Sequence, residues 1–183
     1  DMDRLINELT VYSGIDNNRI PYNFHRINVS DYFKDCVEEV GLDLESKNIK
    51  LNYSSLIEPD TVVIADPEQM KKVINNIISN SVKYMDKPNG HIDIRILDEV
   101  DAIRVEIEDN GKGIAQKDLQ KIFDRFYRTD ASRNSAQGGS GIGLSIVRKI
   151  IEDHGGYIWA TSKEGEGTCM HFVLRKYIEL PPK

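Results

Sequence analysis

The sequence predicts an α/β fold, a two-layer α/β sandwich whose mixed, mostly antiparallel sheet carries about three helices on one face. Three segments, residues 30–46, 67–84 and 141–154, place their apolar residues at helical spacing. Two further segments, 92–96 and 103–107, alternate apolar and polar residues, as strands with one buried face do. Helices pack on the apolar face of such a sheet, so we expect the opposite face to be wetter.

The composition is that of one globular domain. The chain has 183 residues, of which 39% are hydrophobic and 30% are charged. A net charge of −6, with no basic stripe, argues against nucleic acid as a partner. The two cysteines, Cys36 and Cys169, form no framework and suit a reducing compartment. No apolar run approaches the ~20 residues of a membrane span, so we expect no direct membrane contact by this part of the protein.

The N-terminal residues are predicted to lie outside the domain. Helical spacing in residues 1–16 indicates a helix that is marginal alone and belongs to a neighbouring element. Residues 17–29 are polar and are predicted to be a linker. The domain is predicted to span residues 30–177, followed by a tail at 178–183. Its first helix is expected to be capped by Ser30 or Asp31.

The remaining elements follow from local signals. Asp66 and Pro67 supply an N-cap and a first-turn proline for a helix that reaches about Tyr84. The turn between the two alternating segments, Asp98 to Asp101, predicts an antiparallel hairpin. Further strands are expected at residues 49–53, 61–65, 157–162 and 168–176. Residues 127–140 have no periodicity and are predicted to form a mobile loop before the helix that Gly155 and Gly156 end.

One face of the helix after Pro67 is unusually polar. At about 100° per residue, Asn76, Asn80 and Lys83 fall on one side, with Tyr84 at its edge. The nearly opposite side is mostly apolar and holds Met70, Ile74, Ile77, Ser81 and Met85. A solvated helix surface explains such a face. A row of oxygen donors and a cation facing a metal–phosphate group explains it too, because amide oxygens are hard ligands that suit Mg²⁺.

Asp109 ends the second strand of the hairpin. The alternation of Ile103, Val105 and Ile107 gives Asp109 the inward direction, and an inward carboxylate must find a donor. It can cap the glycine-rich turn that follows, or it can accept from a ligand amine such as that of adenine. Gly111 and Gly113 would let the backbone approach a flat ring closely.

The glycine-rich segment 138–144 begins the last helix. Free N–H groups and the helix dipole make such a start suitable for phosphate, although a flexible hinge is the alternative. The segment matches neither the dinucleotide fingerprint nor the Walker pattern. The loop before it can fold over a nucleotide as a lid.

Taken in order, these segments resemble the sequence boxes of histidine protein kinases. Residues 73–84 resemble the Asn-bearing box and residues 109–114 the first Gly box. The Phe box, the second Gly box and the last small Gly motif are matched by residues 123–128, 139–144 and 165–168. The resemblance covers roughly residues 30–176. Residues 3–9 with Ser13 also resemble the end of the second helix of the family's dimerisation domain.

The resemblance implies a Bergerat-type ATP site between the Asn-bearing helix and a mobile ATP lid. Phe123 and Phe126 would anchor this lid; the alternative is that they are ordinary aromatic residues of the core. By this analogy Asn80 binds Mg²⁺, and Lys83 and Arg128 meet phosphate oxygens, so these three are the candidate catalytic residues. The candidate nucleotide-binding residues are Asn76, Asn80, Lys83, Tyr84, Asp109, Gly111, Gly113, Ile114, Tyr127, Arg128, Gly139, Ser140, Gly141, Ile142, Gly143, Leu144 and Thr168.

The implied reaction transfers the ATP γ-phosphoryl group to a histidine. None of His25, His91, His154 and His171 precedes an acidic residue on a helix, as the family's acceptor does, so each is expected to be structural. The acceptor is then expected on the parent's own dimerisation domain, absent from this chain, with a response regulator receiver domain as the next recipient. Family habit implies a cytoplasmic domain of a parent in the bacterial cell membrane.

The sequence leaves three alternatives open. Related ATPases, such as type II topoisomerases and MutL proteins, place a Glu where this chain has Asn76, and that Glu activates water. Without it, rapid hydrolysis is not expected. A serine protein kinase of the anti-sigma-factor type is the second alternative, and a non-catalytic ATP-binding signalling module is the third.

Overall fold

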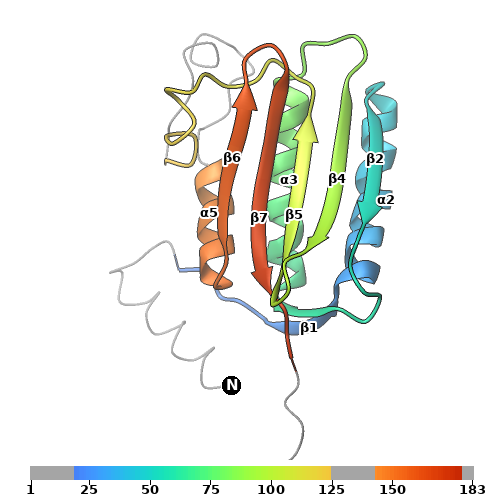
Figure 1. Cartoon of the computed structure of the whole chain (residues 1–183), viewed down its shortest axis with the longest axis vertical. Helices are drawn as coiled ribbons and strands as arrows, with labels where there is room; N and C mark the ends of the chain where they lie inside the picture. The colour runs from blue at the N-terminus through green and yellow to red at the C-terminus, as the bar shows by residue number, and fades with distance from the viewer. Residues whose placement is uncertain (1–18, 125–142, 179–183) are drawn as a thin grey trace, which may run out of the picture.

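The computed structural model describes residues 19–124 and 143–178, which form a five-stranded sheet backed by helices (Figure 1). The strand order is β2-β4-β5-β7-β6, in which β2 is parallel to β4 and the other neighbours are antiparallel. The predicted mixed, mostly antiparallel sheet is therefore confirmed. The strands are β2 (Lys50–Ser55), β4 (His91–Asp98), β5 (Ala102–Asp109), β6 (Tyr157–Lys163) and β7 (Gly167–Arg175).

The helices lie on one face of the sheet, as predicted. They are α2 (Val29–Ser46), α3 (Pro67–Lys83) and α5 (Gly143–Asp153), and all three lie behind the sheet in Figure 1. No described residue covers the face turned toward the viewer. We call that surface the open face. None of the helices in the described ranges is both long and apolar enough to cross a bilayer.

The predicted start of α3 is confirmed. Asp66 is its N-cap, with Oδ1 accepting from the backbone N–H groups of Glu68 at 3.0 Å and Gln69 at 3.2 Å, and Pro67 occupies the first turn. The apolar side of the helix, including Met70 and Ile77, is fully buried against the sheet. Because the cap and the apolar stripe agree, the register of α3 is fixed, and with it the position of its polar C-terminal end.

The predicted cap of α2 is wrong by two or three residues. Asn28 caps the helix, because its side-chain oxygen accepts from the Asp31 N–H at 3.0 Å. Ser30 and Asp31 lie inside the first turn. Asparagine is as good a cap as serine or aspartate, and the fully buried Val29 directly after it begins the apolar stripe.

A short strand precedes α2 where a linker was expected. β1 (His25–Asn28) pairs antiparallel with β3 (Val62–Ala65) in a separate two-stranded sheet. The linker prediction for residues 17–29 is therefore wrong at these four residues. Only Ile27 of β1 is buried, so the sequence carries no visible alternation there.

The β4–β5 hairpin places a continuous apolar layer against the helices. Ile94 lies opposite Ile107 and Ile96 lies opposite Val105, and all four side chains are buried. Fully burying such a side chain contributes roughly 1.5–3 kcal/mol relative to leaving it exposed. The same alternation carries through β5 to Asp109, so the position of this carboxylate follows from the core packing.

Candidate functional site

The C-terminal ends of α3 and β5 meet through a glycine-rich loop. The carbonyl of Tyr84, which caps α3, accepts from the Lys112 N–H at 3.1 Å. A Cβ at Gly111 would lie 2.7 Å from that same carbonyl oxygen, closer than real Cβ contacts allow. Gly111 therefore permits the loop to touch the end of the helix that carries Asn80 and Lys83.

The Asp109 carboxylate points inward, as its strand phase predicts. Its Oδ1 accepts from the Gly111 N–H at 2.9 Å and from the Thr168 N–H at 3.3 Å. Burial raises the pKa of Asp109, while hydrogen bonds from Gly111, the Ser81 side chain and Thr168 act in the opposite direction. The glycine-turn cap considered above is thus present, and it uses Oδ1. Together with the Ser81 side chain, the two backbone N–H groups make three donors, and a carboxylate with about four acceptor sites can take one more.

The polar end of α3 carries amides and an ammonium group, as predicted. Asn76 and Asn80 are half-buried, and their side chains make no hydrogen bond to another residue in the described ranges. The Nζ of Lys83 lies 5.3 Å from the centre of the Tyr84 ring, and the Nζ of Lys112 lies 4.8 Å from it. Neutral oxygen donors beside two cations fit a metal-bound polyphosphate.

The backbone conformation and close packing at Gly113 require glycine, whether or not a ligand is bound. Its φ is +75°, and a Cβ there would lie 2.3 Å from the Lys163 carbonyl oxygen. The neighbouring Ile114 N–H donates to the Ser162 hydroxyl at 2.8 Å, and this hydroxyl also lies 2.8 Å from that of Thr168. The loop is thus held against β6 and β7. Close approach of a ring to this backbone stays a prediction.

Part of the predicted site lies outside the described residues. Gly143 and Leu144 begin α5, where Gly143 is exposed and Leu144 packs against the core. Phe123 is buried in the core, in agreement with its interpretation as a core aromatic residue. Phe126 lies outside the described residues. The others that fall outside the described ranges are Tyr127, Arg128, Gly139, Ser140, Gly141 and Ile142, together with the loop predicted to be mobile and the helix predicted for residues 1–16.

The structure adds three residues that the sequence patterns did not single out. Ser81 is 4% exposed and hydrogen-bonds to Asp109, although its helical position assigned it to the apolar side of α3. Lys112 was treated only as part of a loop, and Ser162 as part of a strand. Ser81 was recognisable in principle, because it is the one polar residue among the buried positions of α3 and an inward carboxylate needs a donor.

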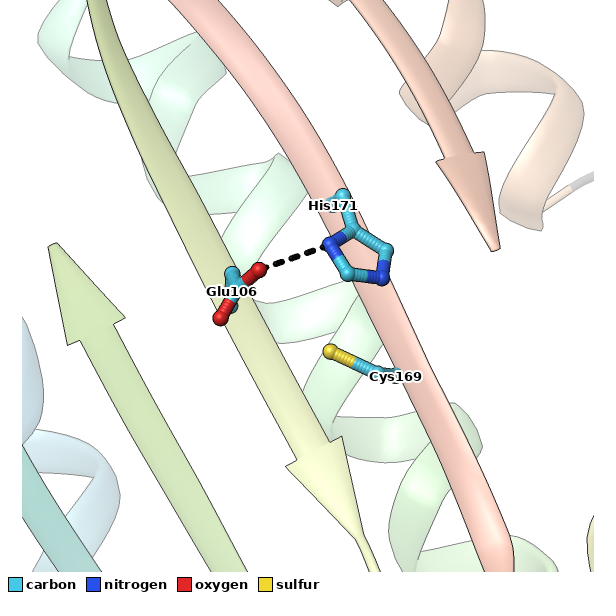
Figure 2. A group of neighbouring side chains, drawn as sticks. All are labelled: Glu106, Cys169 and His171. Carbon is cyan, nitrogen blue, oxygen red and sulfur yellow. Dashed lines mark hydrogen bonds and ion pairs between the residues drawn. The ribbon is translucent and has the colours of Figure 1, made fainter. Parts of the chain in front are cut away.

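A second cluster of chemically capable side chains lies on the open face. Figure 2 shows Glu106, Cys169 and His171, whose potential ligand atoms lie within 4.8 Å of one another. His171 Nδ1 lies 2.9 Å from one oxygen of Glu106, and Arg95 donates to the other at 2.9 Å. Burial raises the pKa of Cys169 to about 12, so its thiol is protonated at neutral pH. A carboxylate already paired with Arg95 and Arg104 beside a neutral thiol is a network of ion pairs rather than a metal centre.

The half-buried histidines make stability dependent on pH. Burial lowers the pKa of both His154 and His171, so the folded protein binds fewer protons than the unfolded chain. We therefore expect the stability they contribute to be fully present above about pH 6.5 and to decrease as the pH falls below that value. Urea unfolding at pH 7.5 and 5.5 measures the effect. Equal unfolding free energies at the two pH values, or an unchanged difference after His154→Gln and His171→Gln, would contradict this assignment.

The chain matches a known protein family over most of its length. The family described as histidine kinase-, DNA gyrase B-, and HSP90-like ATPase matches residues 65–178. The chain belongs to this family. The matched range includes α3, the hairpin, the glycine-rich loop after Asp109 and α5.

Within this ATPase family the chain is similar to sensor histidine kinases. It is 34% identical over 175 residues to sensor histidine kinase WalK of Bacillus subtilis, which covers 94% of this chain and 28% of that protein. It is 32% identical over 176 residues to sensor protein kinase WalK of Staphylococcus aureus, which covers 94% of this chain and 41% of that protein. The chain thus spans less than half of either relative.

The solved structures agree with the sequence relatives. The nucleotide-free catalytic domain of histidine kinase ThkA superposes with a TM-score of 0.71 at 30% identity, covering 84% of this chain and 98% of that one. ThkA solved in complex with response regulator protein TrrA also gives 0.71, at 28% identity, covering 96% of this chain and 47% of that one. The ATPase domain described here is a catalytic domain of the sensor histidine kinase type.

Proposed function

We propose that this domain binds ATP with Mg²⁺ and transfers the γ-phosphoryl group to a histidine on the parent's own dimerisation domain, outside this chain. A response regulator receiver domain then receives the phosphoryl group. Homology to WalK supports the class of reaction, and ThkA, a structural neighbour, was solved with a response regulator. On the same basis we propose that the domain works in the cytoplasm, as part of a parent anchored in the bacterial membrane.

The observation that carries the proposal is the inward carboxylate of Asp109. Its Oδ1 accepts from two backbone donors, and the Ser81 side chain bonds to the carboxylate as well. A carboxylate has about four acceptor sites, so it can still accept from a further donor. An ionised carboxylate in a half-buried site gains most from a ligand that supplies an N–H, because burial has removed part of its hydration. The amino group of adenine supplies such a donor. Tyr84, Ile114 and Thr168 then flank the base.

The end of α3 supplies what a metal-bound triphosphate needs. Asn80 would hold Mg²⁺ through its amide oxygen, with Asn76 one turn away. Lys83 and Arg128 would meet phosphate oxygens, and Gly139 to Leu144 would offer backbone N–H groups at the start of α5. When bound there, Mg²⁺ would supply positive charge against the negative charge that develops during transfer. Lys112, whose ammonium group lies beside Tyr84, adds a second cation at this end of the helix.

The residue at position 76 favours transfer over hydrolysis. Activation of water requires a general base within hydrogen-bond reach of it, and an asparagine amide cannot accept the proton. In phosphoryl transfer the protein mainly positions groups and neutralises charge, which amides, cations and backbone donors can do. The acceptor histidine and its base therefore come from the dimerisation domain.

A phosphotransfer assay tests the proposal. The chain is mixed with ATP, Mg²⁺ and a dimerisation domain that bears the acceptor histidine, with the His→Ala form of that domain as control. We expect phosphate on the unaltered domain alone, in an acid-labile linkage. ATP binding without any transfer would support a non-catalytic module, and an acid-stable product would support the serine kinase alternative.

A further inference from the structure

The segment that leads into the domain, residues 19–24, is hydrogen-bonded to the ends of two helices. We call it the lead-in segment, and Figure 1 shows it passing the lower end of α5 before β1. The Tyr22 hydroxyl donates to the carboxylate of Asp153, the last residue of α5, at 2.5 Å. The Asn23 N–H donates to Asp66 Oδ2, at the start of α3, at 2.8 Å. The segment is thus bonded to both helices at the same end of the domain.

His154 lies at the centre of these contacts. The rings of Tyr22 and Phe24 stack on each other, with centres 5.2 Å apart, and both meet the His154 ring edge-on at 5.3 and 5.1 Å. The two ring nitrogens of His154 are also engaged. Nε2 accepts from the Asp66 N–H at 3.1 Å, so Nδ1 carries the proton and donates to the Ile150 carbonyl at 2.7 Å. A neutral imidazole therefore connects α5, the start of α3 and the lead-in segment.

Asp66 completes the connection by using both carboxylate oxygens. Oδ1 caps α3 through the N–H groups of Glu68 and Gln69, while Oδ2 holds the lead-in segment through Asn23. Asp66 is 5% exposed, so its carboxylate is buried, while the bonds that it makes are part-buried. A movement of the lead-in segment must therefore strain the cap of α3 or break the Asn23 bond.

The opposite ends of the same two helices carry the candidate nucleotide residues. Asn80 and Lys83 lie at the far end of α3, about 21 and about 25 Å from Asp66 at about 1.5 Å per residue. Gly143 and Leu144 lie at the far end of α5. Both helices pack on each other along the sheet. Because a helix moves as a rigid element, fixing one end of each also sets the spacing of their other ends.

We propose that His154 is a positioning residue which, with Tyr22, Asn23 and Asp66, latches the lead-in segment to α3 and α5 and so holds the nucleotide-binding ends of both helices in register. This inference rests on the proposed nucleotide site. With the latch closed, the two helix ends are pre-organised, and nucleotide binding does not have to align them. With the latch open, the alignment must be made on binding, and affinity falls.

Thermodynamic linkage makes the proposal testable in the unchanged chain. If the closed latch raises nucleotide affinity, then nucleotide must raise the stability of the closed latch by the same factor. The Asn23 amide reports closure directly, because its only described partner is Asp66 Oδ2. We expect a saturating Mg²⁺–ATP analogue to slow hydrogen exchange at Asn23 about fivefold, the lower end of typical coupling. The Val100 amide, bonded to Asp98 in the β4–β5 turn, serves as a control and should not change.

Variants separate positioning from ordinary packing. His154→Phe keeps the ring contacts and removes both hydrogen bonds, whereas His154→Gln can still accept from the Asp66 N–H. We expect His154→Phe and Tyr22→Phe to weaken binding of the analogue about fivefold and to abolish its effect on Asn23 exchange, with substantial recovery in His154→Gln. Tyr157→Phe, at an exposed tyrosine on the open face, is the matched control for Tyr22.

The outcomes distinguish the two proposals. If the unchanged chain does not bind the analogue, the proposed function fails. If it binds, but Asn23 exchange is unaffected and the latch variants bind equally well, only the latch is refuted. Latch variants that unfold more easily yet keep the same affinity and the same exchange response would show that His154 is merely structural. Tyr22→Phe removes a single hydroxyl, so it keeps the test valid if His154→Phe fails to fold.

Discussion

We expect the Asp109→Asn variant to bind ATP about 10- to 100-fold more weakly than the unchanged chain, because a hydrogen bond to a charged group contributes roughly 1.5–3 kcal/mol and each 1.4 kcal/mol is about tenfold. The same variant should unfold at an equal or higher temperature. Burial raises the pKa of Asp109, so the ionised carboxylate destabilises the empty fold at neutral pH, and this cost disappears as the pH falls. Asparagine keeps an oxygen that can accept from Gly111 and Thr168.

Calorimetric titration with ATP and GTP, together with thermal unfolding, measures both effects. The loss should fall on ATP and leave GTP little changed, because GTP lacks the adenine amine. Asp101→Asn, at the exposed opposite end of the same hairpin, is the control and should change neither quantity. Equal losses for both nucleotides, or a lower unfolding temperature with intact ATP affinity, would leave Asp109 with a structural role alone.

The Asn80→Ala variant should lose the magnesium-dependent part of nucleotide binding. Loss of a residue that only supports a metal ligand can lower metal affinity roughly 100-fold. Loss of the ligand itself should lower it by at least as much. The fold should tolerate the change, because Asn80 is half-buried and its side chain bonds to no residue in the ranges the structure describes. Titrating the chain with an ATP analogue, with and without Mg²⁺, measures the effect.

The control for Asn80 lies on the same helix. Asn75→Ala removes an identical side chain from an exposed position and should leave binding unchanged with and without metal. If Asn80→Ala retained the full magnesium dependence, the metal would have to be held elsewhere. Loss of binding in both variants would point to damage of α3 rather than loss of a ligand.

Much of the fold was predictable because local signals and core packing agree. The Asp66 cap and Pro67 fixed the start of α3, and the isoleucine alternation fixed which way Asp109 points. β1 escaped prediction because a four-residue strand with one buried side chain has no period to detect. The α2 cap was misassigned because Asn28, Ser30 and Asp31 are all good caps, and only the burial of Val29 decides among them.

The candidate site was less predictable than the fold. Helical spacing correctly grouped Asn76, Asn80 and Lys83, but it placed Ser81 with the apolar residues and gave no reason for its hydroxyl. Lys112 lies beside Tyr84 because the loop after β5 contacts the end of α3. Hydrophobic periodicity does not predict such a contact between a loop and a helix end. The latch around His154 joins residues up to 131 positions apart, and local sequence patterns cannot predict contacts between such distant residues.

The most direct test is a crystal structure of the chain with Mg²⁺ and a non-hydrolysable ATP analogue. We expect an adenine amine within hydrogen-bond distance of Asp109 and a metal about 2.1 Å from the Asn80 amide oxygen, the distance typical of Mg²⁺. A nucleotide bound away from the ends of α3 and β5, or a base whose amine faces away from Asp109, would contradict the proposed site.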